Sequence, residues 1–164
     1  MEKENIKFDD LMKATNLLDS SYKINDRKEV MENVYLVLKG LNEILQNEKL
    51  NKNIELIERE IEKWVAKAKD IGNVITLKMK SDYQIISTVT RRIVWNTGKT
   101  ALVMNKKKDR DELYLRSMNI DVRKFIEMAK RKKYFAGGKK EVMGAIIPKN
   151  EGEKFFEEIL EVIK

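Results

Sequence analysis

Residues 130–148, KRKKYFAGGKKEVMGAIIP, run from the end of a predicted helix through a connection into a predicted strand. Six basic residues and no acidic one occur between Lys130 and Lys140, and they enclose the adjacent glycines Gly137 and Gly138. Adjacent glycines let the backbone come close to a ligand, and the amides of such a turn can form an anion-binding concavity. The stretch is therefore either a phosphate-binding loop or a plain connection, and its residues alone leave both interpretations open.

The positive charge of the chain is concentrated in the same half. Residues 1–73 carry 13 basic and 15 acidic side chains, whereas residues 74–164 carry 21 and 12, within an overall net charge of +7. A basic half favours an anionic partner, and nucleic acid is the first candidate. Any polyanion site is expected in the second half.

Several kinds of chemistry are disfavoured by the composition. The sequence has no cysteine and no histidine, which removes the thiol nucleophile, the histidine triads and the commonest transition-metal ligand. Acidic pairs such as Asp9 and Asp10 do not converge in any visible pattern. We therefore expect a protein that is not an enzyme and that uses no metal and no cofactor. Because no apolar run has the length of a membrane span or of a signal core, we also expect a cytoplasmic location.

The first half is predicted to be helical. Helices are expected over residues 9–19, 26–46 and 54–71, and Gly72 supplies a stop after the third. The second helix has an apolar stripe, which we expect to face the core; it is formed by Val30, Val34, Val37, Leu41 and either Ile44 or Leu45.

The third predicted helix has the clearest pattern. Ile54, Ile57, Ile61 and Trp64 are separated by three, four and three positions, which is the spacing of an apolar helical seam. The seam either packs against the first two helices or is a docking surface for another chain. Both interpretations remain open from the sequence.

After Gly72, predicted strands and helices alternate. Strands are expected over 73–79, 100–105, 112–118 and 141–148, and helices over 83–98, 121–131 and 150–164. This order predicts an α/β fold with a mixed sheet. We therefore divide the chain into a helical segment, 1–72, and a small α/β domain, 73–164.

One stretch of the second half partly matches a nucleotide-binding loop. The sequence NTGKT, residues 96–100, ends like a phosphate-binding P-loop, but Ile93 stands where that motif requires glycine. Gly98 is therefore predicted to be the C-terminal cap of the preceding helix.

Residues from about 74 to 164 resemble the C-terminal, DHH-associated domain of the RecJ-like phosphoesterases. The family's GGGH motif, followed by small residues and a strand, is similar to AGGKKEVMGAII at residues 136–147, with Lys139 in place of the histidine. Arg116 and Ser117, in LRSM, match an arginine of a family strand. A weaker likeness to the family's connecting helices covers ATNLLDSSYKINDRK, at residues 14–28.

The resemblance implies a fold and a function. It implies a stand-alone relative of the family's nucleic-acid-binding half, without the catalytic DHH domain, that binds single-stranded DNA or RNA. The nucleic-acid-binding residues would be Arg116, Arg131, Lys132, Lys133, Tyr134, Gly137, Gly138, Lys139 and Lys140.

The resemblance also implies protein partners. These would be a GINS-like replication complex, as for archaeal RecJ-like proteins, or a RecJ-like nuclease, and the protein would act in DNA replication or repair. Ile54, Ile57, Ile61 and Trp64 would dock the partner. The alternative is a structural or regulatory subunit that has no contact with nucleic acid.

Overall fold

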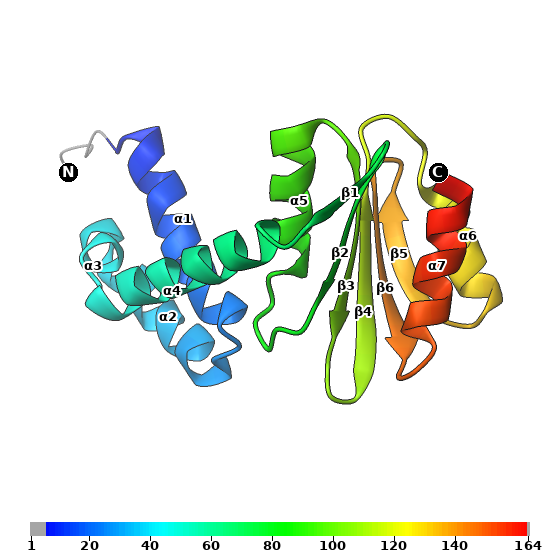
Figure 1. The fold of residues 1–164 in the computed structure, drawn as a ribbon. Helices are drawn as coiled ribbons and strands as arrows, with labels where there is room; N and C mark the ends of the chain where they lie inside the picture. Colours follow the sequence, from blue (N-terminus) through cyan, green and yellow to red (C-terminus); the bar gives the residue numbers. More distant parts are fainter. Residues whose placement is uncertain (1–5, 164) are drawn as a thin grey trace. The chain divides into compact units, whose positions relative to one another are not determined.

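A computed structural model describes residues 6–163 of the 164-residue chain (Figure 1). The chain forms two compact units. The helical unit contains the residues up to Glu60 together with Asp82–Gln84, and the sheet unit contains Ile61–Ser81 with Ile85–Lys164. The division therefore falls within a helix, before Gly72.

The helical unit is built from short helices around a small apolar cluster. Its helices are α1 (Phe8–Lys23), α2 (Arg27–Lys39), α3 (Leu41–Leu45) and α4 (Glu48–Val65), the last of which continues into the sheet unit. Ala14, Leu17, Ile44 and Leu50 form the centre of the cluster. The predicted helix over 26–46 is two helices, because Gly40 has a φ of 113° and interrupts it.

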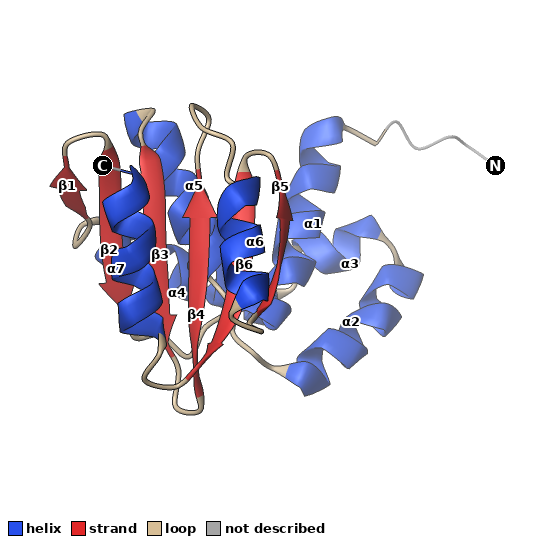
Figure 2. Ribbon diagram, turned by 90° about the vertical axis from the view of Figure 1, so that its right-hand side faces the viewer, coloured by secondary structure: helices blue, strands red, loops and turns tan. Residues whose placement is uncertain are grey.

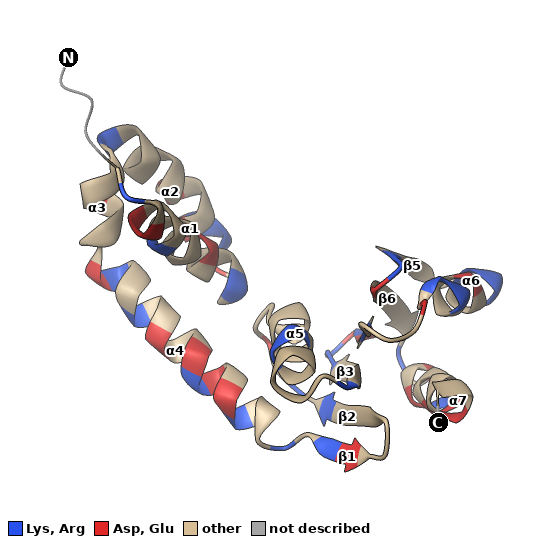
Figure 3. Ribbon diagram, turned by 90° about the horizontal axis from the view of Figure 1, so that it is seen from above, with Lys and Arg blue, Asp and Glu red and all other residues tan. Residues whose placement is uncertain are grey.

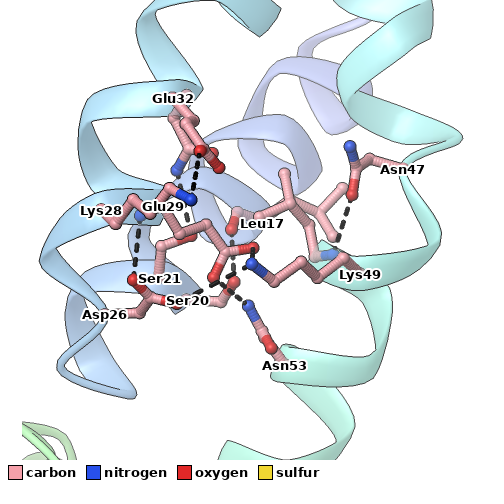
Figure 4. A network of polar contacts seen from close by, with 12 residues as sticks. Leu17, Ser20, Ser21, Asp26, Lys28, Glu29, Glu32, Asn47, Lys49 and Asn53 are labelled. Atoms are coloured by element: carbon pink, nitrogen blue, oxygen red, sulfur yellow. Dashed lines mark hydrogen bonds and ion pairs between the residues drawn. The ribbon is translucent and has the colours of Figure 1, made fainter.

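The orientation of α2 is opposite to the expected one. Val30, Val34 and Val37, predicted to face the core, are exposed, whereas Glu29 and Asn33 are buried. Asn53 donates a hydrogen bond of 2.9 Å to the Glu29 carboxylate, and Lys49 lies 3.4 Å from it (Figure 4). These polar contacts satisfy a buried carboxylate that would otherwise be costly, and they fix which side of α2 faces inward.

The apolar seam of α4 is packed inside the chain. Ile57, Ile61 and Trp64 are buried, and Ile54 packs against the cluster around Leu17. Of the two interpretations that the sequence left open, internal packing describes these four side chains. We therefore correct the predicted docking role of this seam, because three of its side chains present almost no surface that another chain could contact.

The sheet unit contains a six-stranded mixed sheet, which confirms the predicted α/β class (Figure 2). Its strands are β1 (Lys69–Ile71), β2 (Val74–Met79), β3 (Thr100–Lys106), β4 (Arg110–Arg116), β5 (Phe135–Lys139) and β6 (Val142–Pro148). The spatial order is β1-β2-β3-β4-β6-β5. Among the strands of the described residues, only β2 and β3 pair in parallel, across a connection that contains a helix.

Helices cover the two faces of the sheet unequally. Helix α5 (Ile86–Thr97) packs on β3 and β4 from one side, whereas α6 (Arg123–Arg131) and α7 (Gly152–Ile163) lie on the other (Figure 3). Gly98 ends α5 in the left-handed conformation, with a φ of 68°, so the predicted helix cap is confirmed. Ile93 is buried within α5, which is not the geometry of a phosphate-binding loop.

The main core lies between the sheet and the pair α6 and α7. Its members come from both layers: Val74, Leu102, Met104, Leu113, Leu115, Val122, Phe125, Ile126, Ala129, Met143, Ala145, Ile147, Phe155, Phe156, Ile159 and Leu160. Because side chains of a strand alternate between faces, the other residues of β4 and β6 must point to the side of α5.

Candidate nucleic-acid interface

The strands β4, β6 and β5 present one face that helices α6 and α7 do not cover. We call it the open face, and its side chains are those that alternate with the core residues: Arg110, Glu112, Tyr114 and Arg116 of β4, Val142, Gly144, Ile146 and Pro148 of β6, and Phe135, Gly137 and Lys139 of β5. None of these residues is buried.

The strand register arranges the open face in rows. Arg116 and Lys139 both lie opposite Val142, so the first row carries two cations. Tyr114 and Gly137 both lie opposite Gly144 in the second row.

The third row is apolar at its centre. Ile146, which is 42% exposed, is flanked by Glu112 and by Phe135, whose side chain is 79% exposed. A cationic row and a row with a large exposed aromatic ring therefore share one face.

The two cations of the first row are free to meet an anion. Within residues 6–163, no hydrogen bond or ion pair engages the side chain of Arg116 or Lys139. The neighbouring Arg110 differs, because Glu112 lies 3.0 Å from its guanidinium and raises its pKa. The net positive charge of the open face therefore comes from the first row.

Because glycine has no side chain, the second row leaves a shallow region in the middle of the open face, which we call its low centre. A Cβ atom added to Gly137 would meet nothing within 4 Å, so the space above it is open. A Cβ added to Gly144 would lie 3.4 Å from the ring of Tyr114, so that ring leans over the glycine. A ligand can approach the backbone of β5 and β6 beside this ring.

The predicted Gly-Gly loop is a strand, and this corrects the interpretation of residues 137–140. Gly137 and Gly138 belong to β5, and the turn that follows connects β5 to β6. Gly138 has a φ of 150°, and an added Cβ would lie 2.0 Å from the carbonyl oxygen of Val142. The hairpin itself therefore requires glycine at this position.

The turn between β5 and β6 is anchored to the segment after β4. The backbone N–H of Ser117 donates to the carbonyl of Glu141 at 3.0 Å, and that of Val122 donates to the carbonyl of Lys140 at 2.9 Å. Ser117 is itself buried and bonded to Thr100 at 2.7 Å. These contacts hold the ends of β4 and β5 in place, so the first row is preorganised.

The basic run does not belong to the open face. Arg131 ends α6, Lys132 and Lys133 follow it, and α6 packs on the opposite side of the sheet. Lys132 is paired with Glu158 at 3.0 Å. The sequence-predicted set is thus divided between the two sides of the sheet: the open face has Arg116, Gly137 and Lys139, and the α6 side has Arg131, Lys132 and Lys133.

Tyr134, predicted to stack on a base, packs on the α6 and α7 side of the sheet. Its ring meets Phe155 edge-on, with the centroids 5.3 Å apart, and its hydroxyl donates to Glu151 at 2.7 Å. Burial and this hydrogen bond raise the pKa of Tyr134 to about 12. The exposed ring is that of the next residue, Phe135, which begins β5 and lies opposite Ile146 on the open face.

The predicted set of site residues contains neither Phe135 nor Tyr114, although the sequence offers Phe135, beside Tyr134, as a second aromatic residue that could stack on a base. The alternation of β4 contained the signal for Tyr114, because in RDELYLR every second residue is buried and the residues between them are partly exposed. No comparable pattern marks Phe135, because β5 is exposed along nearly its whole length.

No protein-family model and no curated protein matches the sequence. Solved structures do match the fold. RecJ from Thermus thermophilus, in complex with Mg²⁺, superposes with a TM-score of 0.62 at 15% identity over 85% of this chain and 23% of the RecJ chain.

Two further structures extend the likeness over almost the whole chain. A DHH domain from a member of a family of ribosomal proteins matches with a TM-score of 0.67 at 13% identity, over 98% of this chain and 43% of that one. A pGpG-specific phosphodiesterase from Vibrio cholerae matches with a TM-score of 0.58 at 12% identity, over 97% and 61%.

The protein therefore shares its fold with a part of RecJ, of the DHH-domain protein and of the phosphodiesterase. The chain spans only a part of the length of each of these proteins. The described residues contain no cluster of acidic side chains suited to a metal ion. None of the helices within residues 6–163 combines the length and the apolar character needed to cross a bilayer.

Proposed function

We propose that the protein binds single-stranded nucleic acid on the open face without cleaving it. The observation that carries this proposal is the first row, where Arg116 and Lys139 flank Val142 and neither cation has a partner within residues 6–163. Unpaired lysine and arginine side chains on one surface attract the phosphates of a strand. The likeness to RecJ supports a role related to nucleic acid. In this proposal the cations of the open face contact the phosphates.

The shape of the open face favours a single strand over a duplex. Exposed bases stack on aromatic rings of a sheet, whereas the bases of a duplex are stacked on each other. Phe135 is largely exposed beside Ile146, and Tyr114 borders the low centre at Gly144. We therefore place the phosphates at Arg116 and Lys139 and one base on Phe135.

We further propose that the protein holds the strand for a partner. Histidine and cysteine are absent from the sequence, so a nuclease mechanism that depends on them would need residues from outside this sequence. A replication or repair assembly, either a GINS-like complex or a RecJ-like nuclease, is the partner that the resemblance suggests. In this proposal the chain itself is not an enzyme.

The direct test is oligonucleotide binding by charge-reversed variants. Fluorescence anisotropy with labelled single-stranded DNA and RNA compares Lys139→Glu with Lys132→Glu. Both changes reverse a lysine of the second half, but only Lys139 lies on the open face. We expect Lys139→Glu to weaken binding at least tenfold and Lys132→Glu to leave it nearly unchanged.

Two outcomes would count against the proposal. If Lys132→Glu weakens binding more than Lys139→Glu, the strand binds on the side of α6. If the wild-type protein binds neither oligonucleotide at low salt, the second candidate is favoured, a structural subunit without nucleic-acid contact. The exposed apolar side chains of α1 and α2 are the observation that supports this candidate.

A further inference from the structure

Helix α2 presents an apolar ridge that nothing in the described chain covers. Val30, Val34 and Leu38 follow each other at intervals of four residues, and their side chains are 38%, 55% and 79% exposed. Met31 and Tyr35 extend the surface beside the ridge and are 69% and 68% exposed. Soluble monomers rarely expose so many large apolar side chains on one element, and a surface of this kind marks an interaction site.

Polar contacts on the opposite side of α2 hold the helix in the orientation that exposes the ridge. Asn33, on the opposite side of the helix, donates to the hydroxyl of Ser21 at 3.0 Å and to the carbonyl of Leu18 at 3.2 Å. Glu29 is held by Lys49 and Asn53 on the same inner side. Turning the ridge inward would break these buried polar contacts, so the ridge stays outside.

The ridge is complementary to itself. Val30 and Leu38 lie at equal distances along the chain on either side of Val34, so a two-fold axis at Val34 places Val30 of one copy near Leu38 of the other. Rows of residues four apart that interdigitate give the commonest class of helix crossing, near −50°. The spacing of the ridge therefore permits two copies of α2 to cross at Val34.

Charge does not oppose this contact. Glu32 is the charged residue within the span of the ridge, and it lies 3.7 Å from Lys28 of the same helix. Asn33, a polar residue in the span, points inward. The ridge is therefore a seam free of unpaired charge, as the centre of a homodimer interface requires.

We propose that α2 pairs with α2 of a second copy of this chain, with Val34 on the two-fold axis. The pair buries the ridge and its flanking Met31 and Tyr35 on both copies. The exposed parts of these five large side chains supply most of the ~800 Å² per partner that a standard interface buries.

The first experiment measures mass in solution by analytical ultracentrifugation over a concentration series. The chain has a mass of 19.3 kDa, and we expect the wild type to sediment as a particle of twice that mass. Val34→Glu places like charges across the axis and should give the single-chain mass. Met118→Glu, at a residue that is 68% exposed in the sheet unit, is the matched control and should remain dimeric.

A second experiment uses the absence of cysteine in the sequence. Val34→Cys introduces one thiol on the axis, where two copies can form a disulfide, and Met118→Cys introduces one elsewhere. Under mild oxidation we expect a covalent dimer from Val34→Cys in large excess over the control. Circular dichroism of each variant verifies the fold, and Leu38→Lys replaces Val34→Glu if the latter does not fold.

Three results would overturn the proposal. They are a wild type that stays a single chain at every concentration, a dimer that persists in the folded Val34→Glu and Leu38→Lys variants, and equal crosslinking of the two cysteine variants. A wild type that stays a single chain would mean that the ridge does not bind a second copy. A dimer that persists in both variants would place the contact between copies on another surface.

Discussion

Arg116 of β4 and Lys139 of β5 lie on the two sides of the same residue of β6, Val142. Because adjacent strands are about 4.8 Å apart, the two backbones are separated by roughly 10 Å. The cations therefore stand as two separate positions on a preformed surface. This spacing suits successive contacts along a strand of nucleic acid more than a single chelated ion.

The two cations should each account for part of the salt dependence of binding. A phosphate contact to a single strand adds about 0.7 to the slope of log K against log salt concentration. We expect Arg116→Ala and Lys139→Ala each to lower the slope by about this amount. Lys133→Ala should not change it. Titrations at several salt concentrations measure the slope, and an unchanged slope in both open-face variants would remove them from the site.

Phe135 should contribute by stacking. Its side chain is 79% exposed, so Phe135→Ala should change the free energy of unfolding by less than about 0.5 kcal/mol. Loss of a stacked base should weaken strand binding by about 1–3 kcal/mol. Tyr134→Phe keeps the packed ring and should bind normally. A Phe135→Ala variant with wild-type affinity would show that no base stacks there.

The two adjacent glycines should differ in their response to alanine. Gly138→Ala places a Cβ 2.0 Å from the carbonyl oxygen of Val142 at a φ of 150°, so we expect it to destabilise the fold by ~3 kcal/mol or more. Gly137→Ala meets no atom within 4 Å and should leave stability nearly unchanged. Urea denaturation measures both. Equal effects would mean that the β5–β6 hairpin is not formed as described.

Tyr134 should give a distinct signal at high pH. Burial and the hydrogen bond to Glu151 raise its pKa from 10.0 to about 12, so the neutral hydroxyl is favoured in the folded state. The associated stability is complete below pH 10.0 and is lost as the pH rises toward 12. Ultraviolet titration of the folded protein should show one late-titrating tyrosine that Tyr134→Phe lacks. A titration with no late component in the wild type would contradict the packing of this residue.

The sequence predicted the central elements well because each has a strong apolar pattern. Strands β2, β3 and β6 and helices α5 and α7 bury most of their apolar residues, and their periodicity is visible without a structure. The cap at Gly98 was predictable for a similar reason, since a left-handed helix end favours glycine.

The missed elements lack that pattern. Strand β5 is an edge strand with two glycines and an exposed surface, so its backbone pairing with β6 leaves no trace in the apolar periodicity. Strand β1 has three exposed residues. The orientation of α2 was predicted wrongly because its inner side is polar, and Glu29 and Asn33 find their partners on α4 and α1 only in the folded chain.

Only some of the predicted site residues lie on the open face. Arg116 and Lys139 were selected from a resemblance, and strand pairing on either side of Val142 places them in one row. The basic run was grouped with them because it is close in sequence. Alternation along β5 and the end of α6 separate it from the open face, which only the register reveals.

The most direct test of the proposed function is a map of the bound strand on the protein. Titration of an isotopically labelled sample with a short single-stranded oligonucleotide, followed by amide NMR, reports the affected residues. We predict shifts concentrated at Arg116, Phe135, Gly137 and Lys139, with little change at Lys132 and Lys133. Shifts confined to the end of α6, or none at all, would contradict strand binding on the open face.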